Sequence, residues 1–127
     1  MKSLKVFLWL VALHSFCVGM GLILIPLAYY DMFGFGNYRG DFFKIQAGVF
    51  HLVMVMAYSL GAYDPVKYRV LIIFAILAKF TATFFLLGYS LFIDMIWTVL
   101  VSGIADALMG LILLGLYRKL VRSSINS

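Results

Sequence analysis

The chain contains few charged residues, and this shortage decides the class of protein to which it belongs. Of its 127 residues, only 12% are charged, whereas 65% are apolar. A soluble domain of this size has about a quarter of its residues charged. The composition therefore excludes an ordinary water-soluble fold and predicts an integral membrane protein.

Cysteine is almost absent as well, and its scarcity excludes further classes. The single cysteine, Cys17, lies inside an apolar stretch. One cysteine cannot form a disulfide framework within one chain, and thiol–disulfide exchange usually uses a pair. The chain also lacks a glycosylation sequon and a low-complexity tract. Because it has only 127 residues and no linker, we predict a single domain over residues 1–127.

Four long stretches carry almost no charge. They are Val6–Tyr30, Ile45–Tyr63, Val70–Ile93, interrupted only by Lys79, and Met95–Tyr117, interrupted only by Asp106. A span needs roughly 20 apolar residues to cross the bilayer. The sequence therefore predicts an all-α integral membrane protein with helices over about residues 4–30, 42–62, 68–89 and 95–118. The first stretch is about twice the usual length of a signal-peptide core, so we expect it to be retained as a span.

The connections between these stretches are short, and their charges differ. Short loops place consecutive helices side by side, which predicts a four-helix bundle of up-down-up-down order. The two ends of the chain and the loop "YDPVKYR" carry Lys2, Lys5, Lys67, Arg69, Arg118, Lys119 and Arg122, whereas the other two loops carry Arg39 and Lys44. Short loops rich in Lys and Arg stay in the cytoplasm. We therefore expect both termini to be cytoplasmic, and the basic excess requires no nucleic acid partner.

The longest predicted loop, "FGFGNYRGDFF" at residues 33–43, combines three glycines with aromatic residues. Its Phe and Tyr side chains are typical of the aromatic belt at a membrane surface. A lid over a ligand site is the alternative interpretation. A phosphate-binding loop is excluded, because no strand precedes the glycines and no Gly-Lys-Ser/Thr follows them.

Lys79 and Asp106 are the charged residues inside the four apolar stretches, and we expect them to meet. At 1.5 Å per residue, Lys79 lies roughly 15 Å from Arg69, and Asp106 roughly 18 Å from Arg118. On adjacent antiparallel helices these depths are nearly level. Both residues share a helix face with small residues, which mark close approach between membrane helices. An ionisable residue inside a span almost always faces the bundle and pairs.

Two histidines lie at a similar depth on the other two predicted helices. By the same rise per residue, His14 is roughly 14 Å from Lys5, and His51 is roughly 20 Å from Asp64. Together with Lys79 and Asp106 they form a predicted polar layer near the middle of the membrane. Tyr58 shares a face with His51, and Gln46 lies further out on the same helix; both are candidates for the same site.

This polar layer has several interpretations. It can be structural, holding helix order and register through a buried ion pair. It can instead bind a small polar group or relay protons, because titratable groups in membranes cluster on such pathways. Axial ligation of a haem by His14 and His51, or of a metal by His14, Cys17, His51 and Asp106, is a weaker alternative. No haem-attachment motif is present, and we predict no cofactor.

Three segments resemble the small DoxX-like and BphX-like membrane proteins. They are "GMGLILIPLAYYDMFGF", "FFKIQAGVFHLVMVMAYSLGAYDPVKYRVLIIFAILAKF" and "IADALMGLILLGLYRKL". The resemblance implies a four-helix protein of the bacterial inner membrane, and it also singles out Lys79 and Asp106 by position. Some members of that group accompany redox enzymes or catabolic pathways. Thiol redox chemistry in such relatives uses more cysteine than Cys17 provides.

Three functions follow from these patterns as hypotheses. The first is a non-enzymatic membrane protein, either an accessory subunit of a larger complex or a binder of a small lipophilic or polar ligand. The second is a small proton-coupled transporter, in which homo-oligomerisation supplies further helices, since no inverted repeat is present. The third is a membrane redox component or an enzyme acting on a lipophilic substrate such as a quinone, with His51 or Asp106 as acid or base. No catalytic motif favours the third.

Overall fold

Five helices and no strand make up the part of the chain that the structure describes, residues 1–36 and 38–127. The structure is a computed structural model. The helices are α1 (Lys2–Leu24), the 3₁₀ helix η1 (Leu27–Phe33), α2 (Phe42–Tyr63), α3 (Arg69–Phe92) and α4 (Trp97–Ile125). The four α-helices are long and apolar enough to cross a membrane. The predicted all-α membrane fold is confirmed.

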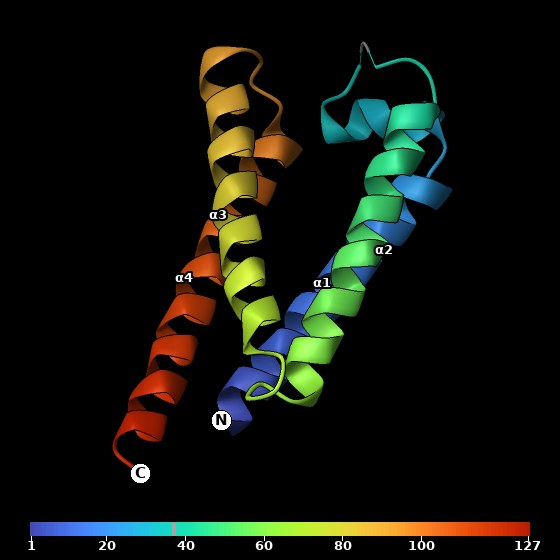
Figure 1. The fold of residues 1–127 in the computed structure, drawn as a ribbon. Coiled ribbons are helices and arrows are strands. Elements are labelled where there is room, and N and C mark those ends of the chain that lie inside the picture. The colour runs from blue at the N-terminus through green and yellow to red at the C-terminus, as the bar shows by residue number, and fades with distance from the viewer. Residues whose placement is uncertain (37) are drawn as a thin grey trace.

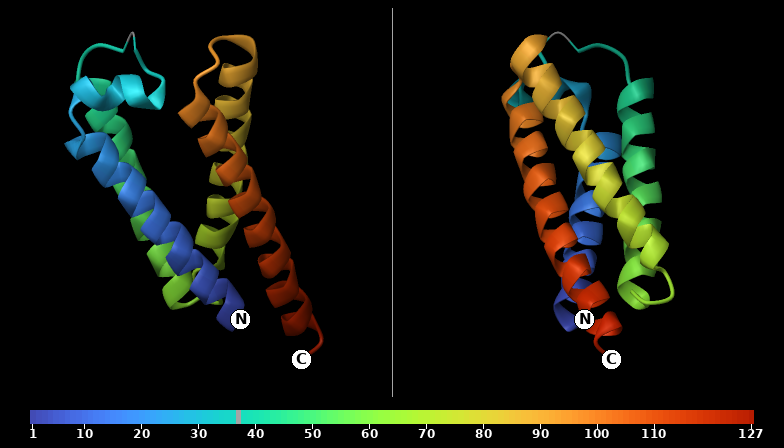
Figure 2. Two further views of the ribbon diagram at one scale, coloured as in Figure 1. Left: turned by 180° about the vertical axis from the view of Figure 1, so that it is seen from behind. Right: turned by 60° about the vertical axis from the view of Figure 1, so that its left-hand side comes forward.

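The four α-helices form two antiparallel hairpins. Helix α1 lies beside α2, and α3 lies beside α4, and most contacts between helices occur within these two pairs (Figure 1). The hairpins approach each other at the end that holds both chain termini and the α2–α3 connection, and they diverge toward the other end (Figure 2). We call the first the basic end, because the seven Lys and Arg residues of these segments lie there, and the second the loop end.

The main apolar core lies in the half of the molecule nearer the basic end. All four α-helices contribute to it: Leu4, Leu8, Val11, Ala12, Tyr58, Ala62, Ile72, Ala75, Ile76 and Leu113. Lipid tails are as apolar as these side chains, so close packing rather than escape from water holds the helices together. The two hairpins are therefore joined where this packing is densest.

Glycines allow α1 and α2 to touch through their backbones. A Cβ atom added to Gly48 would lie 2.7 Å from the carbonyl oxygen of Gly19, and one added to Gly19 would lie 2.9 Å from the carbonyl oxygen of Gly48. Real Cβ atoms do not approach so closely, so only glycine fits at either position. The first hairpin therefore depends on small residues, as the helix pairs of membrane proteins commonly do.

The end of α1 corrects one prediction. The apolar stretch predicted a helix to about residue 30, but α1 ends at Leu24. Ile25 is extended, with φ −71° and ψ 121°, because the residue before a proline avoids the helical region, and Pro26 follows. Residues 27–33 form η1 instead. The fourth helix differs in the opposite sense, since it continues to Ile125 rather than ending near residue 118.

The diverging hairpins are bridged at the loop end by η1, which reaches from the first hairpin to the second. The Thr98 hydroxyl at the start of α4 donates a hydrogen bond to the carbonyl oxygen of Phe33. Gly34 ends η1 with φ +90°, a conformation that favours glycine, and lies against Ile96 and Trp97. In Figure 2 this segment, drawn in cyan, extends toward the start of α4. The two hairpins thus touch at both ends.

Candidate functional site

Lys79 and Asp106 form a buried ion pair between α3 and α4, as the sequence predicts. Lys79 Nζ donates to Asp106 Oδ1 at 2.7 Å, and the two residues are 4% and 9% exposed. Gly110 lies one turn from Asp106 on α4, and a Cβ there would be 3.3 Å from Lys79 Cβ. The small residues of α4 therefore bring the two helices close enough for the short contact.

Tyr58 joins the pair from α2. Its ring centroid is 5.5 Å from Lys79 Nζ, a cation–π distance, and Tyr58 is 3% exposed. A desolvated cation–π contact contributes about 2 kcal/mol. The ammonium of Lys79 is thus held by a carboxylate on one helix and an aromatic face on another, and this contact connects the two hairpins next to the core.

A cleft of about 520 Å³ begins at Asp106 and extends to the loop end. It lies mainly between α1 and α4. Its lining residues are His14, Cys17, Val18, Gly21, Leu22, Ile25, Tyr30, Phe33, Phe35, His51, Leu86, Thr98, Val99, Ser102 and Asp106. Polar side chains therefore gather at its deep end, aliphatic ones line its middle, and aromatic ones cover its mouth.

Asp106 is the residue common to the ion pair and the cleft. Among the residues that the structure describes, its one side-chain hydrogen-bond partner is Lys79, which uses Oδ1. Asp106 also lines the cleft, so Oδ2 is available there as an acceptor. Lys79 does not line the cleft and lies behind the carboxylate. The deep end of the cleft therefore carries an acceptor whose negative charge is already balanced.

The two histidines line the same cleft but have different surroundings. His51 is half-buried, and Ser15 Oγ lies 3.2 Å from its Nδ1 and donates to its carbonyl oxygen at 3.0 Å. A hydroxyl has one proton to donate, so Ser15 accepts from Nδ1–H, and Nε2 of His51 is left as an acceptor. His14 is exposed. Its imidazole meets the cleft without a protein hydrogen bond among the described residues.

The aromatic loop covers the mouth of the cleft. Tyr30, Phe33 and Phe35 line it, whereas Phe42 and Phe43 are exposed, at 70% and 73%. The lid interpretation therefore fits the first half of the loop and the belt interpretation the second. Burial raises the pKa of the Tyr30 phenol, and the neighbouring Tyr38 and Asp41 raise it further. The phenol is consequently a neutral hydrogen-bonding group.

The remaining residues that the sequence suggested for the site either lie apart from the cleft or do not form a metal site. Gln46 is exposed on α2 and does not line it. Cys17 lines it as a free thiol. Within residues 1–36 and 38–127, no three His, Cys, Asp or Glu side chains are close enough to hold a metal ion. Although His14, Cys17, His51 and Asp106 all line the cleft, no three of them are therefore arranged as a coordination site for a metal ion.

Lys44 supports the loop end of the cleft, and sequence reasoning did not single it out. It is 5% exposed, and its Nζ donates to the carbonyl oxygen of Ile25 at 2.9 Å, lies 3.9 Å from Asp41 Oδ1 and faces the Tyr30 ring at 5.5 Å. Ile25 and Tyr30 both line the cleft. The available signal was Pro26, which stops α1 and leaves carbonyl groups that need a donor.

We expect Lys44→Met to lower the free energy of unfolding by about 1.5–3 kcal/mol, because it removes a charge-assisted hydrogen bond and leaves the Ile25 carbonyl unpaired. Denaturation in mixed micelles, followed by circular dichroism, measures the change. Lys119→Met is the control, since Lys119 is exposed on α4 and should change stability by less than about 0.5 kcal/mol. Equal effects of the two substitutions would contradict the assigned role of Lys44.

The description of the fold and the cleft thus rests on the structure of this chain. Comparison with models of known protein families, with curated proteins and with solved structures finds no match to this chain.

Proposed function

We propose that this multi-pass membrane protein binds a small amphipathic molecule in the cleft between its two hairpins. The observation that carries the proposal is the gradient along the cleft, from Asp106, His14 and His51 at the deep end to Tyr30 and the phenylalanines at the mouth. Ligand sites are typically concave, largely apolar and provided with a few convergent polar groups, with volumes of about 300–1,000 Å³. The cleft has all of these properties.

The polar groups favour a neutral, hydrogen-bonding head group. A free carboxylate would favour a cation, but the charge of Asp106 is balanced by Lys79 at 2.7 Å. The acceptors that remain are Asp106 Oδ2 and the imidazole of His51. A ligand with a hydroxyl or N–H group at one end and an apolar body satisfies them, and the aliphatic middle of the cleft receives the body.

Extraction of bound molecules tests the proposal. The protein is purified in a mild detergent from its native membrane, and molecules extracted into organic solvent are identified by mass spectrometry. Ser102→Phe fills the cleft and should lower the recovered ligand at least tenfold. Leu108→Phe is the matched control, because Leu108 is exposed on the same helix and does not line the cleft. Equal recovery from both variants, or no molecule above the detergent background, would refute binding in the cleft.

An accessory role in a larger complex is compatible with ligand binding, and the same purification records it. Proteins that co-purify in fixed ratio with the chain, and that are lost on solubilisation in harsher detergent, would support the role of accessory subunit. A single species at the mass of one chain, or of a homo-oligomer, would support a self-sufficient binder instead.

A transporter is the second candidate, and the divergence of the hairpins toward the loop end favours it. The cleft lies on that side, and the core joins the hairpins on the other. In such a mechanism the Lys79–Asp106 pair opens when protons or substrate pass. If the protein is a transporter, vesicles that contain it and are loaded with the identified ligand should release the ligand faster than loaded vesicles without the protein. If the protein only binds the ligand, the two release rates should be equal.

We also propose membership of the DoxX-like group, a location in a bacterial inner membrane, and cytoplasmic termini. The three resembling segments support the first two. The seven Lys and Arg residues at the basic end, against Arg39 and Lys44 on the other side, support the orientation.

A reporter fused after Ser127 tests this orientation. Green fluorescent protein, which folds in the bacterial cytoplasm, should fluoresce, and alkaline phosphatase, which requires the periplasm, should be inactive at the same position. Fusion within the loop end, after Gly40, should give the opposite pair of results. Active phosphatase after Ser127 would reverse the assigned orientation.

A further inference from the structure

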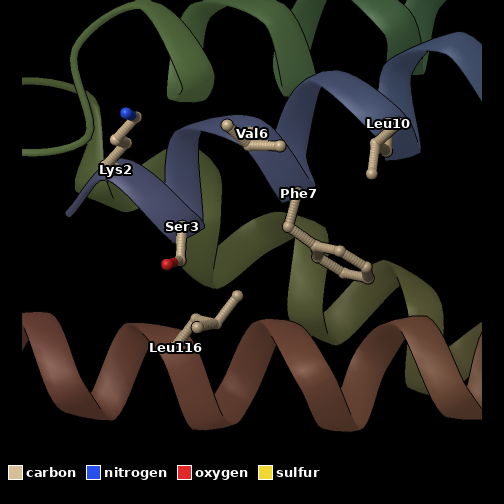
Figure 3. A pocket seen from close by; sticks show the side chains of 6 residues that line it. All are labelled: Lys2, Ser3, Val6, Phe7, Leu10 and Leu116. Atoms are coloured by element: carbon tan, nitrogen blue, oxygen red, sulfur yellow. The ribbon is translucent and has the colours of Figure 1, made fainter.

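A second hollow lies at the basic end of the molecule, between the start of α1 and Leu116 of α4. Its volume is about 400 Å³. Five of its lining residues come from the start of α1, and Leu116 faces them from α4; Figure 3 shows them as sticks, with the Phe7 ring and the Ser3 hydroxyl directed toward α4. The full lining is Lys2, Ser3, Val6, Phe7, Leu10 and Leu116. None of these residues lines the cleft at Asp106.

The hollow has a polar end and an apolar length. Ser3, Val6, Phe7 and Leu10 follow the 3-and-4 spacing of one helix face. From Ser3 to Leu10 this face is roughly 10 Å long at 1.5 Å per residue. Val6 and Leu10 are 52% and 55% exposed, so the apolar stretch is open to the acyl chains of the surrounding leaflet. Lys2 and Ser3 lie where that leaflet meets water.

Charge at the basic end selects the kind of lipid. Among the residues that the structure describes, salt bridges occur at Lys44–Asp41 and Lys79–Asp106, and none involves the seven cations of the basic end. The carboxylate of that end, Asp64, accepts the backbone N–H groups of Val66 and Lys67. The positive charge of the basic end is therefore not balanced within the protein.

We propose that this hollow binds an anionic phospholipid, with the phosphate at Lys2 and Ser3 and one acyl chain along Val6, Leu10 and Leu116. The Ser3 hydroxyl, which Figure 3 shows directed toward α4, donates to a phosphate oxygen. The exposed Lys2 side chain is turned away from Leu116 in Figure 3, and in the proposed complex it rotates about its side-chain bonds to bring its ammonium to the same phosphate. Lys119 lies about one turn beyond Leu116 on α4; it does not line the hollow, but its positive charge adds to that of the basic end. Basic residues at a membrane surface attract anionic lipids in this way, and the hollow adds a place for the chain.

Native mass spectrometry tests this site with two lipids of identical chains. The purified protein receives equal amounts of palmitoyl-oleoyl phosphatidylglycerol, which is anionic, and palmitoyl-oleoyl phosphatidylcholine, which is zwitterionic. The wild type should retain the anionic lipid preferentially. Loss of one charge near an anionic head group lowers affinity about fivefold, so Lys2→Ala/Ser3→Ala should weaken retention of phosphatidylglycerol by at least that factor. Retention of phosphatidylcholine should fall by less, because the choline cation already offsets the charge of its phosphate.

Two further variants separate a site from general attraction of charge. Lys67→Ala removes a cation from the same end but from the α2–α3 loop, and it should leave the first-bound phosphatidylglycerol unchanged. Val6→Trp fills the hollow without changing charge, and it should lower retention of both lipids. An equal loss in Lys67→Ala and Lys2→Ala/Ser3→Ala, or normal retention in Val6→Trp, would overturn the proposal.

Inorganic phosphate provides the last comparison. At millimolar concentration it should not displace the phospholipid, because it lacks the chain that occupies the hollow. Displacement by phosphate alone would show that the site recognises a free anion, and it would overturn the assignment to a lipid. All variants alter exposed or partly exposed side chains, and unchanged circular dichroism spectra confirm that they fold.

Discussion

Single substitutions Lys79→Met and Asp106→Leu are each expected to lower the free energy of unfolding by about 3–5 kcal/mol, and the double mutant is expected to regain most of that loss. Each single substitution leaves one charge buried without its partner. Replacing both residues with apolar ones of similar size removes the charges together, which proteins often tolerate without loss.

The structure explains why these effects should be large. The pair is 2.7 Å long and nearly fully buried, and Tyr58 covers the ammonium from another helix. In Lys79→Met, Asp106 retains contact with the cleft and can protonate or bind water there. In Asp106→Leu, the ammonium keeps only the aromatic face. We therefore expect Asp106→Leu to be the more damaging of the two.

Unfolding in mixed micelles, followed by circular dichroism, gives the four free energies of this cycle. Asp41→Leu is the control, because its carboxylate is 3.9 Å from Lys44 and 64% exposed. Its removal should change stability by less than about 1 kcal/mol. If both single substitutions leave stability at the wild-type value, Lys79 must reach water by another route, and the pair does not form in the membrane protein.

The same variants distinguish a structural pair from a binding site. If the pair only holds α3 against α4, the double mutant should keep its ligand as well as its stability. If Asp106 also contacts the ligand, stability should return while the amount of co-purified ligand falls. Recovery of bound molecules and unfolding are measured on the same preparation, so the two outcomes are distinguishable.

The second large effect is expected at Gly48. A Cβ there would meet the Gly19 carbonyl oxygen at 2.7 Å and Ile23 Cγ1 at 2.6 Å. A side chain can turn away from such a contact, but a backbone carbonyl cannot, so α1 and α2 must separate. Overpacking typically lowers stability by about 1–3 kcal/mol, and we expect Gly48→Ala within this range and Gly48→Val beyond it.

Gly115 provides the matched control for Gly48. It lies inside α4, and a Cβ added there would meet nothing within 4 Å. Gly115→Ala should raise stability by about 0.4–1 kcal/mol, because alanine loses less conformational freedom on folding. Opposite signs of the two alanine substitutions would confirm the close α1–α2 contact. The same sign at both positions would mean that the helices cross elsewhere.

Sequence reasoning predicted the ion pair because depth and helix face are local properties. A rise of 1.5 Å per residue places Lys79 and Asp106 at one level, and the small residues beside them identify the facing sides. The end of α1 was equally local but was missed. The proline rule that correctly ends α2 before Pro65 also ends α1 before Pro26, whereas the prediction followed the apolar run to Tyr30.

The cleft could not be predicted, because it depends on the angle between the two hairpins. That angle is set by contacts between residues far apart in sequence, such as Thr98 with Phe33, which are 65 positions apart. The positions of the polar residues along each helix predicted that His14, His51 and Asp106 lie in one layer. It gave no means of deciding that Gln46 faces away from the cleft, or that Lys44 is buried beneath the loop.

The position of the ion pair within one hairpin has a consequence for synthesis of the chain. A lysine or an aspartate at the centre of a span disfavours insertion by about 2.5–3.5 kcal/mol each. Lys79 and Asp106 are 27 residues apart and lie on consecutive helices. Lys79 is synthesised first, and its partner follows on the very next helix. We therefore expect the ammonium to stay unpaired in the bilayer only until α4 enters beside α3, and the second hairpin contains both charges of the pair.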